Sequence, residues 1–550
     1  MKEKTPYIVP IACGVVLLAV ILYLLPDSLF GGFGRPGNGR GSSGDAERLA
    51  GKGRPVEEGS SVEGTHDLSA ELLAALLMKL SSAEAKPHEA ILEFKDAGAL
   101  KAFLARADQA GLKILGTLDK LNMVRVGYDD LRNLRDDMRD YADGYAGFGA
   151  NYYVHIPEVP SAENRPQQQV AKFGEGALAF MGVKGNISPW GKGITIAILD
   201  SGISSHPAFA AGRVRSIDIG MGLTGTSETD GHATAVASLA GGAAPGAMGV
   251  APAAELLSIR VTNSEGTSDM FTLAQGIQAA VDAGAQVINI SLGAYQDSSV
   301  LSRMIGYAQD HGSIIVAAAG NDQATQLTWP AADPRVISVG AVDALGQQVP
   351  FSNSGETLSS TAPGVDLSSA WPGNQIVSFD GTSGSAPLMA GAIAAVMSLN
   401  PNLTAQQAAS LLTTYSADAG APGHDPDFGF GTVDIGYALN FANPDYIDTS
   451  ISGQYFDAAA GSVEFVVQNR SGQAVSGMTL RINAAGTSSV IDVPAMQPGE
   501  RWSYIVPVDQ ALLNTEGQLA YTSQLRNPSG VVDQNPANNS KASLVFKVGE

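Results

Sequence analysis

Three polar residues stand where a strand is expected to end or a helix to begin, and together they could carry out acyl transfer. Asp200 follows the apolar run Ile-Ala-Ile-Leu, where a carboxylate is costly to bury unless it has a hydrogen-bond partner. His232 lies in Asp-Gly-His-Ala-Thr and Ser383 in Gly-Thr-Ser-Gly-Ser-Ala-Pro. Acyl transfer needs a nucleophilic serine, a histidine that takes its proton and a carboxylate that fixes the histidine tautomer. Each residue alone fits an ordinary turn or helix cap, but the three types together favour a catalytic triad.

A fourth segment could stabilise a developing oxyanion. Asn321 ends the run Val-Ala-Ala-Ala-Gly-Asn, from which its side-chain N–H could be aimed at a substrate; the alternative is a turn asparagine. An α/β-hydrolase is excluded, because that fold requires Gly-x-Ser-x-Gly and the chain order Ser, Asp, His. Here Ser385 stands two residues after Ser383, and the order is Asp, His, Ser.

Alternating strand and helix patterns must position these side chains. The strand segments are short, continuous and rich in Val and Ile, which is typical of a parallel sheet buried on both faces. They cover 194–199, 255–261, 286–291, 313–318 and 336–339. Helix patterns cover 235–240, 271–283, 300–311 and 388–397. Ligands bind at the carboxyl ends of the strands in such sheets, so we expect an α/β domain over 170–444 with its site at that edge.

The motifs around the four residues resemble those of subtilases, the subtilisin-like serine endopeptidases. The resemblance covers residues 190–435, and the order Asp, His, Ser is that of subtilisin. It implies a mostly parallel subtilisin-like sheet flanked by helices, and peptide-bond hydrolysis through an acyl-enzyme. Ser383 would be the nucleophile, His232 the general base and then acid, Asp200 the orienting carboxylate and Asn321 the oxyanion donor.

The same resemblance assigns substrate binding. The strands that pair with an extended peptide would include Gly266 and the run Ser291, Leu292 and Gly293. The primary specificity pocket would be lined by Ala318, Ala319 and Gly320. The implied partner is a protein or peptide substrate.

Two departures from the family pattern lie near the candidate site. Ala233 follows the histidine where glycine is usual, and Leu388 replaces the histidine after Ala-Pro. We expect both to be tolerated, because alanine suits a helix and Leu388 lies off the catalytic path. A clash of the Ala233 methyl group near the substrate is the alternative.

No cofactor or metal is expected to take part in the chemistry. The calcium site of typical subtilisins is expected to be absent, because the loop 241–250 is short and lacks Asn and Asp, and Ala208 stands where an aspartate is common. A structural calcium ion elsewhere is left open. Asp425 and Asp427 are more simply explained as exposed turn carboxylates.

The N-terminus carries an apolar run of 19 residues, 7–25, which is long enough to cross a bilayer. Residues 1–30 are predicted to be an uncleaved signal anchor; a cleaved signal peptide is the alternative, although no small-residue cleavage site follows. Cys13 lies inside the run, where it cannot serve as a lipoprotein signal. Residues 31–65, rich in Gly, Ser and charge, are predicted to be a flexible linker.

Residues 66–160 show the order strand, helix, strand, strand, helix, strand, which is typical of a ferredoxin-like α+β domain. Its last strand is expected at 152–156. Subtilases have an N-terminal propeptide of this order, so the resemblance implies an intramolecular inhibitor and folding chaperone whose tail enters the active cleft. Autocleavage would fall between His155 and Gln169 and would separate the protease from the membrane anchor.

The C-terminal region, 448–550, alternates apolar and polar residues between turn signals, which predicts a β-sandwich. The segment 533–539, Asp-Gln-Asn-Pro-Ala-Asn-Asn, resembles bacterial adhesion-type modules. Binding of a substrate or surface and stabilisation of the protease domain both stay open as roles.

The charge of the chain excludes one class of function. The 550 residues include 33 basic and 54 acidic ones, a net charge of −21, and residues 171–444 hold 8 basic and 21 acidic ones. Such a surface repels polyanions, so nucleic-acid binding is excluded as the main function. With Cys13 as the only cysteine, no intramolecular disulfide can form. We expect a bacterial-type cell-envelope protein, anchored in the membrane with its catalytic domain outside the cytoplasm and released if processing occurs.

Two functions of other classes compete with that of an endopeptidase. A catalytically inactive subtilase-like binding protein has Ala233 as its only support. A structural adhesin carried by the sandwich would leave residues 170–444 unexplained.

Overall fold

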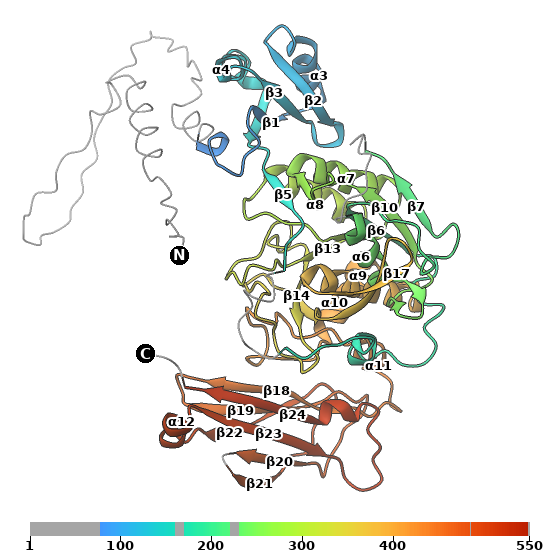
Figure 1. The fold of residues 1–550 in the computed structure, drawn as a ribbon, viewed down its shortest axis with the longest axis vertical. Helices are drawn as coiled ribbons and strands as arrows, with labels where there is room; N and C mark the ends of the chain where they lie inside the picture. Colours follow the sequence, from blue (N-terminus) through green and yellow to red (C-terminus); the bar gives the residue numbers. More distant parts are fainter. Residues whose placement is uncertain (1–77, 160–169, 220–229, 485, 548–550) are drawn as a thin grey trace, which may run out of the picture. The chain divides into compact units, whose positions relative to one another are not determined.

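The computed structural model describes residues 78–159, 170–219, 230–484 and 486–547 (Figure 1). The predicted anchor and linker lie outside these residues, as does most of the expected cleavage window. Among the described residues, one helix is long and apolar enough to cross a membrane, α9 (Thr382–Leu399). Because 89% of it is buried inside the protein, α9 is a core helix.

Seven parallel strands form the central sheet, in the order β15-β14-β13-β12-β6-β10-β7. The strands are β6 (Thr195–Asp200), β7 (Val214–Ile217), β10 (Glu255–Arg260), β12 (Val287–Ile290), β13 (Ile314–Ala318), β14 (Ile337–Val342) and β15 (Ser360–Pro363). The prediction of an α/β fold with a mostly parallel sheet is confirmed.

Helices cover both faces of this sheet, which explains why its central strands β6, β12 and β13 are mostly apolar and buried. They are α6 (Asp230–Gly241), α7 (Met270–Asp282), α8 (Ser299–Asp310), α9 and α10 (Ala405–Thr414). Ile196 and Ile198 of β6 share a core with α6, α9 and α10, whereas Ala197 and Leu199 share a core with α7 and α8. Alternate residues of β6 therefore point to opposite faces, and the polar Asp200 comes at its end.

A smaller antiparallel sheet, β2-β3-β1-β4, belongs to the N-terminal domain. In chain order its elements are β1 (Glu89–Phe94), α3 (Ala97–Arg106), β2 (Leu112–Leu118), β3 (Met123–Tyr128), α4 (Leu131–Asp140) and β4 (Tyr145–Gly149). Leu92 and Phe94 pack with α3 and α4, whereas Ile91 joins the core that contains α7. This sheet is thus buried on both faces, one of them against the catalytic region.

The prediction that residues 152–156 form the last strand of this sheet is wrong. β4 takes that position, with Phe148 opposite Leu92. Instead, β5 (Tyr153–His155) pairs with β11 (Thr267–Asp269) of the catalytic region. Strand preference is set by neighbours across the sheet, so the local pattern alone could not identify the partner.

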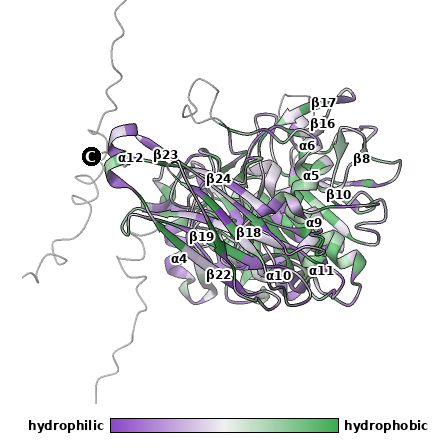
Figure 2. Cartoon of the chain, turned by 90° about the horizontal axis from the view of Figure 1, so that it is seen from below, coloured by the Kyte–Doolittle hydropathy of each residue, from purple (hydrophilic) through white to green (hydrophobic). Residues whose placement is uncertain are grey.

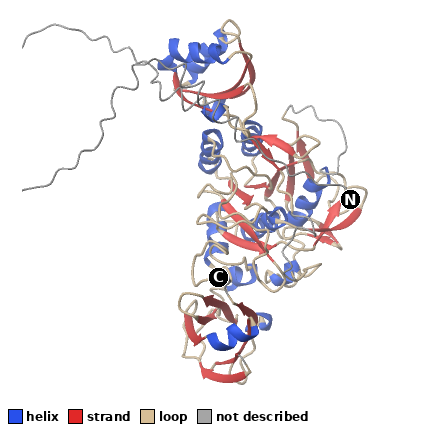
Figure 3. Ribbon diagram, turned by 60° about the vertical axis from the view of Figure 1, so that its left-hand side comes forward, coloured by secondary structure: helices blue, strands red, loops and turns tan. Residues whose placement is uncertain are grey.

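Two antiparallel sheets, β18-β19-β22 and β21-β20-β23-β24, form the C-terminal domain (Figure 3). Their strands are β18 (Thr449–Asp457), β19 (Ser462–Asn469), β20 (Thr479–Ala484), β21 (Thr487–Asp492), β22 (Arg501–Pro507), β23 (Gln518–Arg526) and β24 (Ser540–Phe546), and α12 (Gln510–Glu516) precedes β23. Phe465, Leu480 and Tyr521 from the two sheets share one core. Hydrophobic and hydrophilic residues accordingly mix along these strands (Figure 2).

Candidate active site

Asp200 and His232 form a hydrogen-bonded pair at the carboxyl end of β6. Both carboxylate oxygens of Asp200 lie 2.9 Å from Nδ1 of His232. Because a carboxylate only accepts hydrogen bonds, Nδ1 carries the proton and Nε2 is left able to accept one. Asp200 is fully buried, and the backbone N–H of Ser201 donates to it at 2.6 Å. These bonds satisfy the buried carboxylate and select the histidine tautomer that a general base requires.

The first turn of α6 packs against two aromatic side chains of the segment 367–379. A Cβ added to Gly231 would lie 2.2 Å from the indole of Trp371, so glycine is required for this close contact. The ring of Phe379 lies 5.4 Å from the imidazole, centroid to centroid. The segment that leads into Ser383 therefore also packs against the histidine.

Ser383 lies in the first turn of α9, which begins at Thr382 rather than at Leu388 as the sequence predicts. Pro387 sits inside the helix and has no N–H to donate to the carbonyl of Ser383 four residues earlier. That carbonyl instead accepts a hydrogen bond from the hydroxyl of Ser291 at 3.3 Å. The Ser383 hydroxyl is buried and has no hydrogen-bond partner among the described residues. Folding alone does not favour an unpartnered buried hydroxyl, whereas a nucleophile that awaits substrate accounts for it.

The side-chain amide of Asn321 has a defined orientation. Its Oδ1 accepts hydrogen bonds from the N–H and the hydroxyl of Thr382 at 3.0 and 2.9 Å. Nδ2 therefore points the other way, and it donates to the carbonyl oxygen of Pro157 at 3.0 Å. A Cβ added to Gly381 would lie 3.0 Å from Nδ2, and φ of this glycine is +119°, so Gly381 leaves room for the amide.

The chain segment that contains Pro157 runs between two of the predicted substrate-binding positions. His155 exchanges two backbone hydrogen bonds with Gly293, at 3.1 and 2.9 Å, and the N–H of Ile156 donates to the carbonyl of Gly266 at 3.1 Å. An extended peptide bonded on both sides in this way is held by β-strand addition. The segment thus reaches Asn321 in the manner of a bound peptide.

The other predicted binding residues are buried. Leu292 is fully buried in the core, and the hydroxyl of Ser291 accepts a hydrogen bond from Asn289 at 3.1 Å. Ala318, Ala319 and Gly320 are buried at the end of β13. Of the seven predicted binding residues, Gly266 and Gly293 contact the segment 153–158 through their backbones.

A cleft of about 480 Å³ surrounds this segment. Besides the segment itself and the predicted positions Gly266 and Gly293, seven residues line it: Glu84, Glu265, Ala294, Tyr295, Gln296, Asp322 and Thr328. Tyr295 lies two residues after the Ser-Leu-Gly motif, and Asp322 directly follows Gly-Asn. Neither is among the predicted site residues, but extension of each motif along the chain would have identified both.

The described residues contain no group of three or more His, Cys, Asp or Glu side chains that could hold a metal ion. Ala208, which stands where an aspartate is common at the calcium site of typical subtilisins, is fully buried.

The expectation of an exposed carboxylate is wrong for Asp425, which is 7% exposed. One of its oxygens accepts hydrogen bonds from the N–H groups of Asp427 and Phe428 at 2.8 and 2.9 Å, and burial raises its pKa. Its side chain therefore stabilises a turn.

Asp269 joins the N-terminal domain to the catalytic region. It accepts a hydrogen bond from the N–H of Thr272 at 2.9 Å, which caps α7. Lys86 and Arg125 of the N-terminal domain each approach the same carboxylate to 3.0 Å. Burial acts to raise the pKa of Asp269, but the two cations and the N–H together hold it below the usual value.

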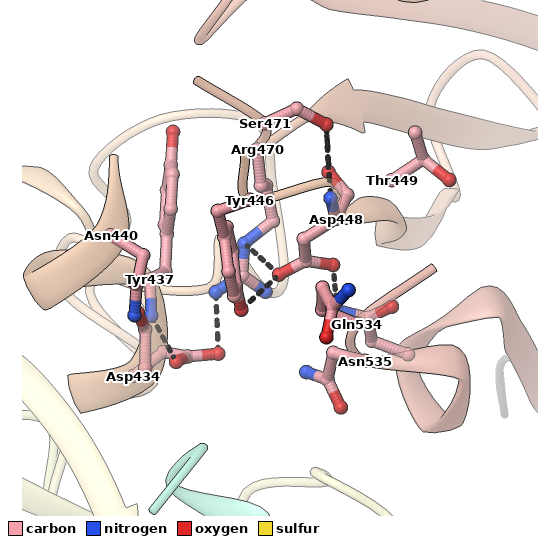
Figure 4. A network of polar contacts seen from close by, with 12 residues as sticks. Asp434, Tyr437, Asn440, Tyr446, Asp448, Thr449, Arg470, Ser471, Gln534 and Asn535 are labelled. Carbon is pink, nitrogen blue, oxygen red and sulfur yellow. Dashed lines mark hydrogen bonds and ion pairs between the residues drawn. The ribbon is translucent and has the colours of Figure 1, made fainter. Parts of the chain in front are cut away.

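Arg470 joins the catalytic region to the sandwich at a buried position (Figure 4). Its guanidinium pairs with Asp434, the N-cap of α11 (Ile435–Asn440), and its Nε lies 3.6 Å from Asp448. Asp448 also accepts a hydrogen bond from Asn538 at 2.8 Å. Burial acts to lower the pKa of Arg470, but the two carboxylates raise it above its usual value.

The segment 533–539 also has an internal partner. The carboxylate of Asp533 accepts hydrogen bonds from the N–H of Thr449 at 3.1 Å and from the amide of Asn539 at 3.0 Å. These contacts tie the segment to the first strand of the sandwich, which gives its Asp- and Asn-rich composition a structural explanation.

Comparisons with known proteins identify the family of the chain. Residues 191–431 match the Peptidase_S8 family model, described as the subtilase family. A thermostable alkaline protease of Halalkalibacterium halodurans is 32% identical over 287 residues, 51% of this chain and 78% of the relative. Subtilisin BL of Lederbergia lenta is 36% identical over 215 residues, 38% of this chain and 79% of the relative. A solved structure is also similar, the crystal structure of fervidolysin from Fervidobacterium pennivorans, a keratinolytic enzyme related to subtilisin. Its TM-score is 0.55 at 19% identity, and the match covers 86% of this chain and 77% of that one. At this identity the similarity supports the fold alone. The chain belongs to the subtilase family and is a subtilisin-like serine peptidase.

Proposed function

We propose that this subtilase is an endopeptidase that uses Asp200, His232 and Ser383, and that it is made as a zymogen whose N-terminal domain fills its own cleft. One observation carries the proposal: the amide of Asn321 donates to the carbonyl of Pro157 at 3.0 Å. A donor that faces a peptide carbonyl beside a buried serine, with the peptide hydrogen-bonded along its length, is the arrangement that acyl transfer needs.

Acylation follows from these positions. Nε2 of His232 takes the proton of the Ser383 hydroxyl while its oxygen forms a bond to the carbonyl carbon. Asn321 and the backbone N–H of Ser383 donate hydrogen bonds to the oxyanion, and Asp200 stabilises the imidazolium through Nδ1. The carbon–nitrogen bond then breaks, and His232 gives the proton to the leaving amine. Water repeats the sequence on the ester and releases the acid.

The N-terminal domain is proposed to be the inhibitor. It contacts the catalytic region through Asp269, through the buried face of its sheet and through the segment in the cleft. The bond after the carbonyl that Asn321 contacts joins Pro157 and Glu158, so we place autocleavage there, within the expected window. After cleavage, the segment that ends at Pro157 would remain as a product-like inhibitor until the domain dissociates.

The membrane tether remains a proposal from the sequence. If residues 1–30 anchor the chain, cleavage after Pro157 separates the catalytic region from the anchor, because the two lie on opposite sides of that bond. The protease would then act outside the cytoplasm on protein or peptide substrates. No cofactor is invoked for any step.

An activity-based probe tests the catalytic proposal. A fluorophosphonate should label the processed wild type, and Ser383→Ala should abolish the labelling. Ser410→Ala, at an exposed position on α10, is the matched control and should label fully. Absence of labelling in correctly processed, folded wild type would instead favour a subtilase-like binding protein without activity.

A further inference from the structure

Tyr295 links two walls of the cleft. It follows Gly293 and Ala294, which form one wall, and its hydroxyl donates to the carboxylate of Asp322 on the other at 2.5 Å. Burial, together with this hydrogen bond, raises the pKa of Tyr295 to about 12. The phenol is therefore protonated at neutral pH and acts as the donor.

Asn353 holds both Tyr295 and the backbone at Asp322 through hydrogen bonds. It is fully buried, and its Nδ2 donates to the Tyr295 hydroxyl at 3.0 Å and to the carbonyl of Ala319 at 3.2 Å. Its Oδ1 accepts hydrogen bonds from the N–H groups of Asp322 and Ala324, both at 3.0 Å. Every hydrogen-bonding position of this amide is thus used to hold Tyr295 against the loop that carries Asn321.

Thr328 occupies the space between the same walls. It is 4% exposed. A Cβ added to Gly293 would lie 2.3 Å from its hydroxyl oxygen, and one added to Gly320 would lie 3.1 Å from its methyl carbon. The Nδ2 of Asn353 would lie 2.2 Å from that second Cβ. The side chains of Thr328 and Asn353 therefore already fill the base of the space between Gly293 and Gly320.

We propose that Tyr295 is a specificity-determining residue that spans the primary pocket and restricts the substrate residue before the scissile bond to a short, uncharged side chain. The inference rests on the proposed function and deepens it. Pro157, whose carbonyl contacts Asn321, lines the cleft together with Tyr295, Asp322 and Thr328, and it is itself short and uncharged. A longer side chain would have to displace the tyrosine and break its bonds to Asp322 and Asn353.

Peptide hydrolysis by the processed enzyme tests this assignment. Four otherwise identical peptides carry Ala, Leu, Phe or Lys before the scissile bond, and kcat/KM is measured for each. We expect wild type to favour Ala over Phe by at least about tenfold, since even small size differences in a pocket are worth 10–200-fold. Tyr295→Ala should reduce this ratio at least tenfold through faster cleavage of the Phe peptide. Tyr295→Phe keeps the ring but loses its bonds to Asp322 and Asn353, so its ratio should lie between those of wild type and Tyr295→Ala.

A second tyrosine–aspartate pair supplies the matched control. Tyr307 donates to Asp282 at 3.2 Å and does not line the cleft, so Tyr307→Ala should leave the ratio unchanged. Equal cleavage of the Ala and Phe peptides by wild type, or an unchanged ratio in folded, active Tyr295→Ala, overturns the assignment while the proposed function stands. Absence of both hydrolysis and fluorophosphonate labelling in processed wild type overturns the proposed function and the assignment with it.

Discussion

Thr382 donates two hydrogen bonds to Oδ1 of Asn321, from its backbone N–H at 3.0 Å and from its hydroxyl at 2.9 Å. These bonds decide which end of the amide faces the peptide carbonyl. The residue just before the proposed nucleophile thus orients the proposed oxyanion donor. The Asn321 amide and the Ser383 hydroxyl, which are proposed to act on the same carbonyl, are thereby held in a fixed position relative to one another.

Removal of the Asn321 amide should reduce catalysis without unfolding the enzyme. For Asn321→Ala we expect kcat to fall by about 10²–10³ with a small change in KM, because the oxyanion develops only in the transition state. Steady-state kinetics on a short peptide measure both constants. Asn483→Ala, at an exposed position on β20, is the control. An Asn321→Ala enzyme with wild-type kcat would remove this residue from the oxyanion site.

Replacement of Ala233 by glycine tests the main departure from the family pattern. Ala233 is fully buried in α6, so the change should lower stability by about 1 kcal/mol through the weaker helix propensity of glycine. We expect kcat/KM to stay within about threefold of wild type. A tenfold or larger gain in kcat/KM would show instead that the methyl group obstructs the site. Thermal unfolding and peptide hydrolysis give the two readouts.

Asp269 should make docking of the N-terminal domain sensitive to acid. Its pKa is lowered in the docked state, so its contribution is complete above the ordinary value of 3.8 and is lost as the pH falls below it. In the uncleaved Ser383→Ala chain, thermal unfolding should show a stability loss as the pH falls below about 4, and Asp269→Asn should diminish this loss. At pH 7, Asp269→Asn itself should cost about 1–3 kcal/mol. An identical pH dependence in both chains would contradict this role.

The buried pair of Arg470 with Asp434 should couple the sandwich to the catalytic region. Arg470→Met leaves Asp434 and Asp448 without their cation, and loss of one partner of a buried pair costs about 3–5 kcal/mol. We expect a lower melting temperature with near-normal kcat/KM on a short peptide at low temperature. Arg481→Met, at an exposed position on β20, is the control and should melt as wild type does. Normal melting of Arg470→Met would argue against a stabilising role for the sandwich.

Local patterns were sufficient for the elements that are buried on both faces. The continuous apolar run before Asp200 predicts β6, and the position of the carboxylate at its end predicts where chemistry belongs. Features that depend on residues far away in the sequence could not be predicted from local patterns. The true start of α9 depends on how Ser291 satisfies the carbonyl that Pro387 leaves open, and Asn353 reaches Tyr295 from a segment 58 residues away. The pairing of β5 with β11, which places Pro157 at Asn321, is likewise a property of the assembled fold.

The mass and N-terminal sequence of the mature enzyme test the central claim most directly. If Ser383 attacks the carbonyl that Asn321 contacts, wild type should yield a mature chain that begins at Glu158, whereas Ser383→Ala should stay intact under the same conditions. Ser410→Ala should process as wild type does. An intact wild-type chain that is nevertheless active, or cleavage after Pro157 that persists in purified Ser383→Ala, would contradict the account.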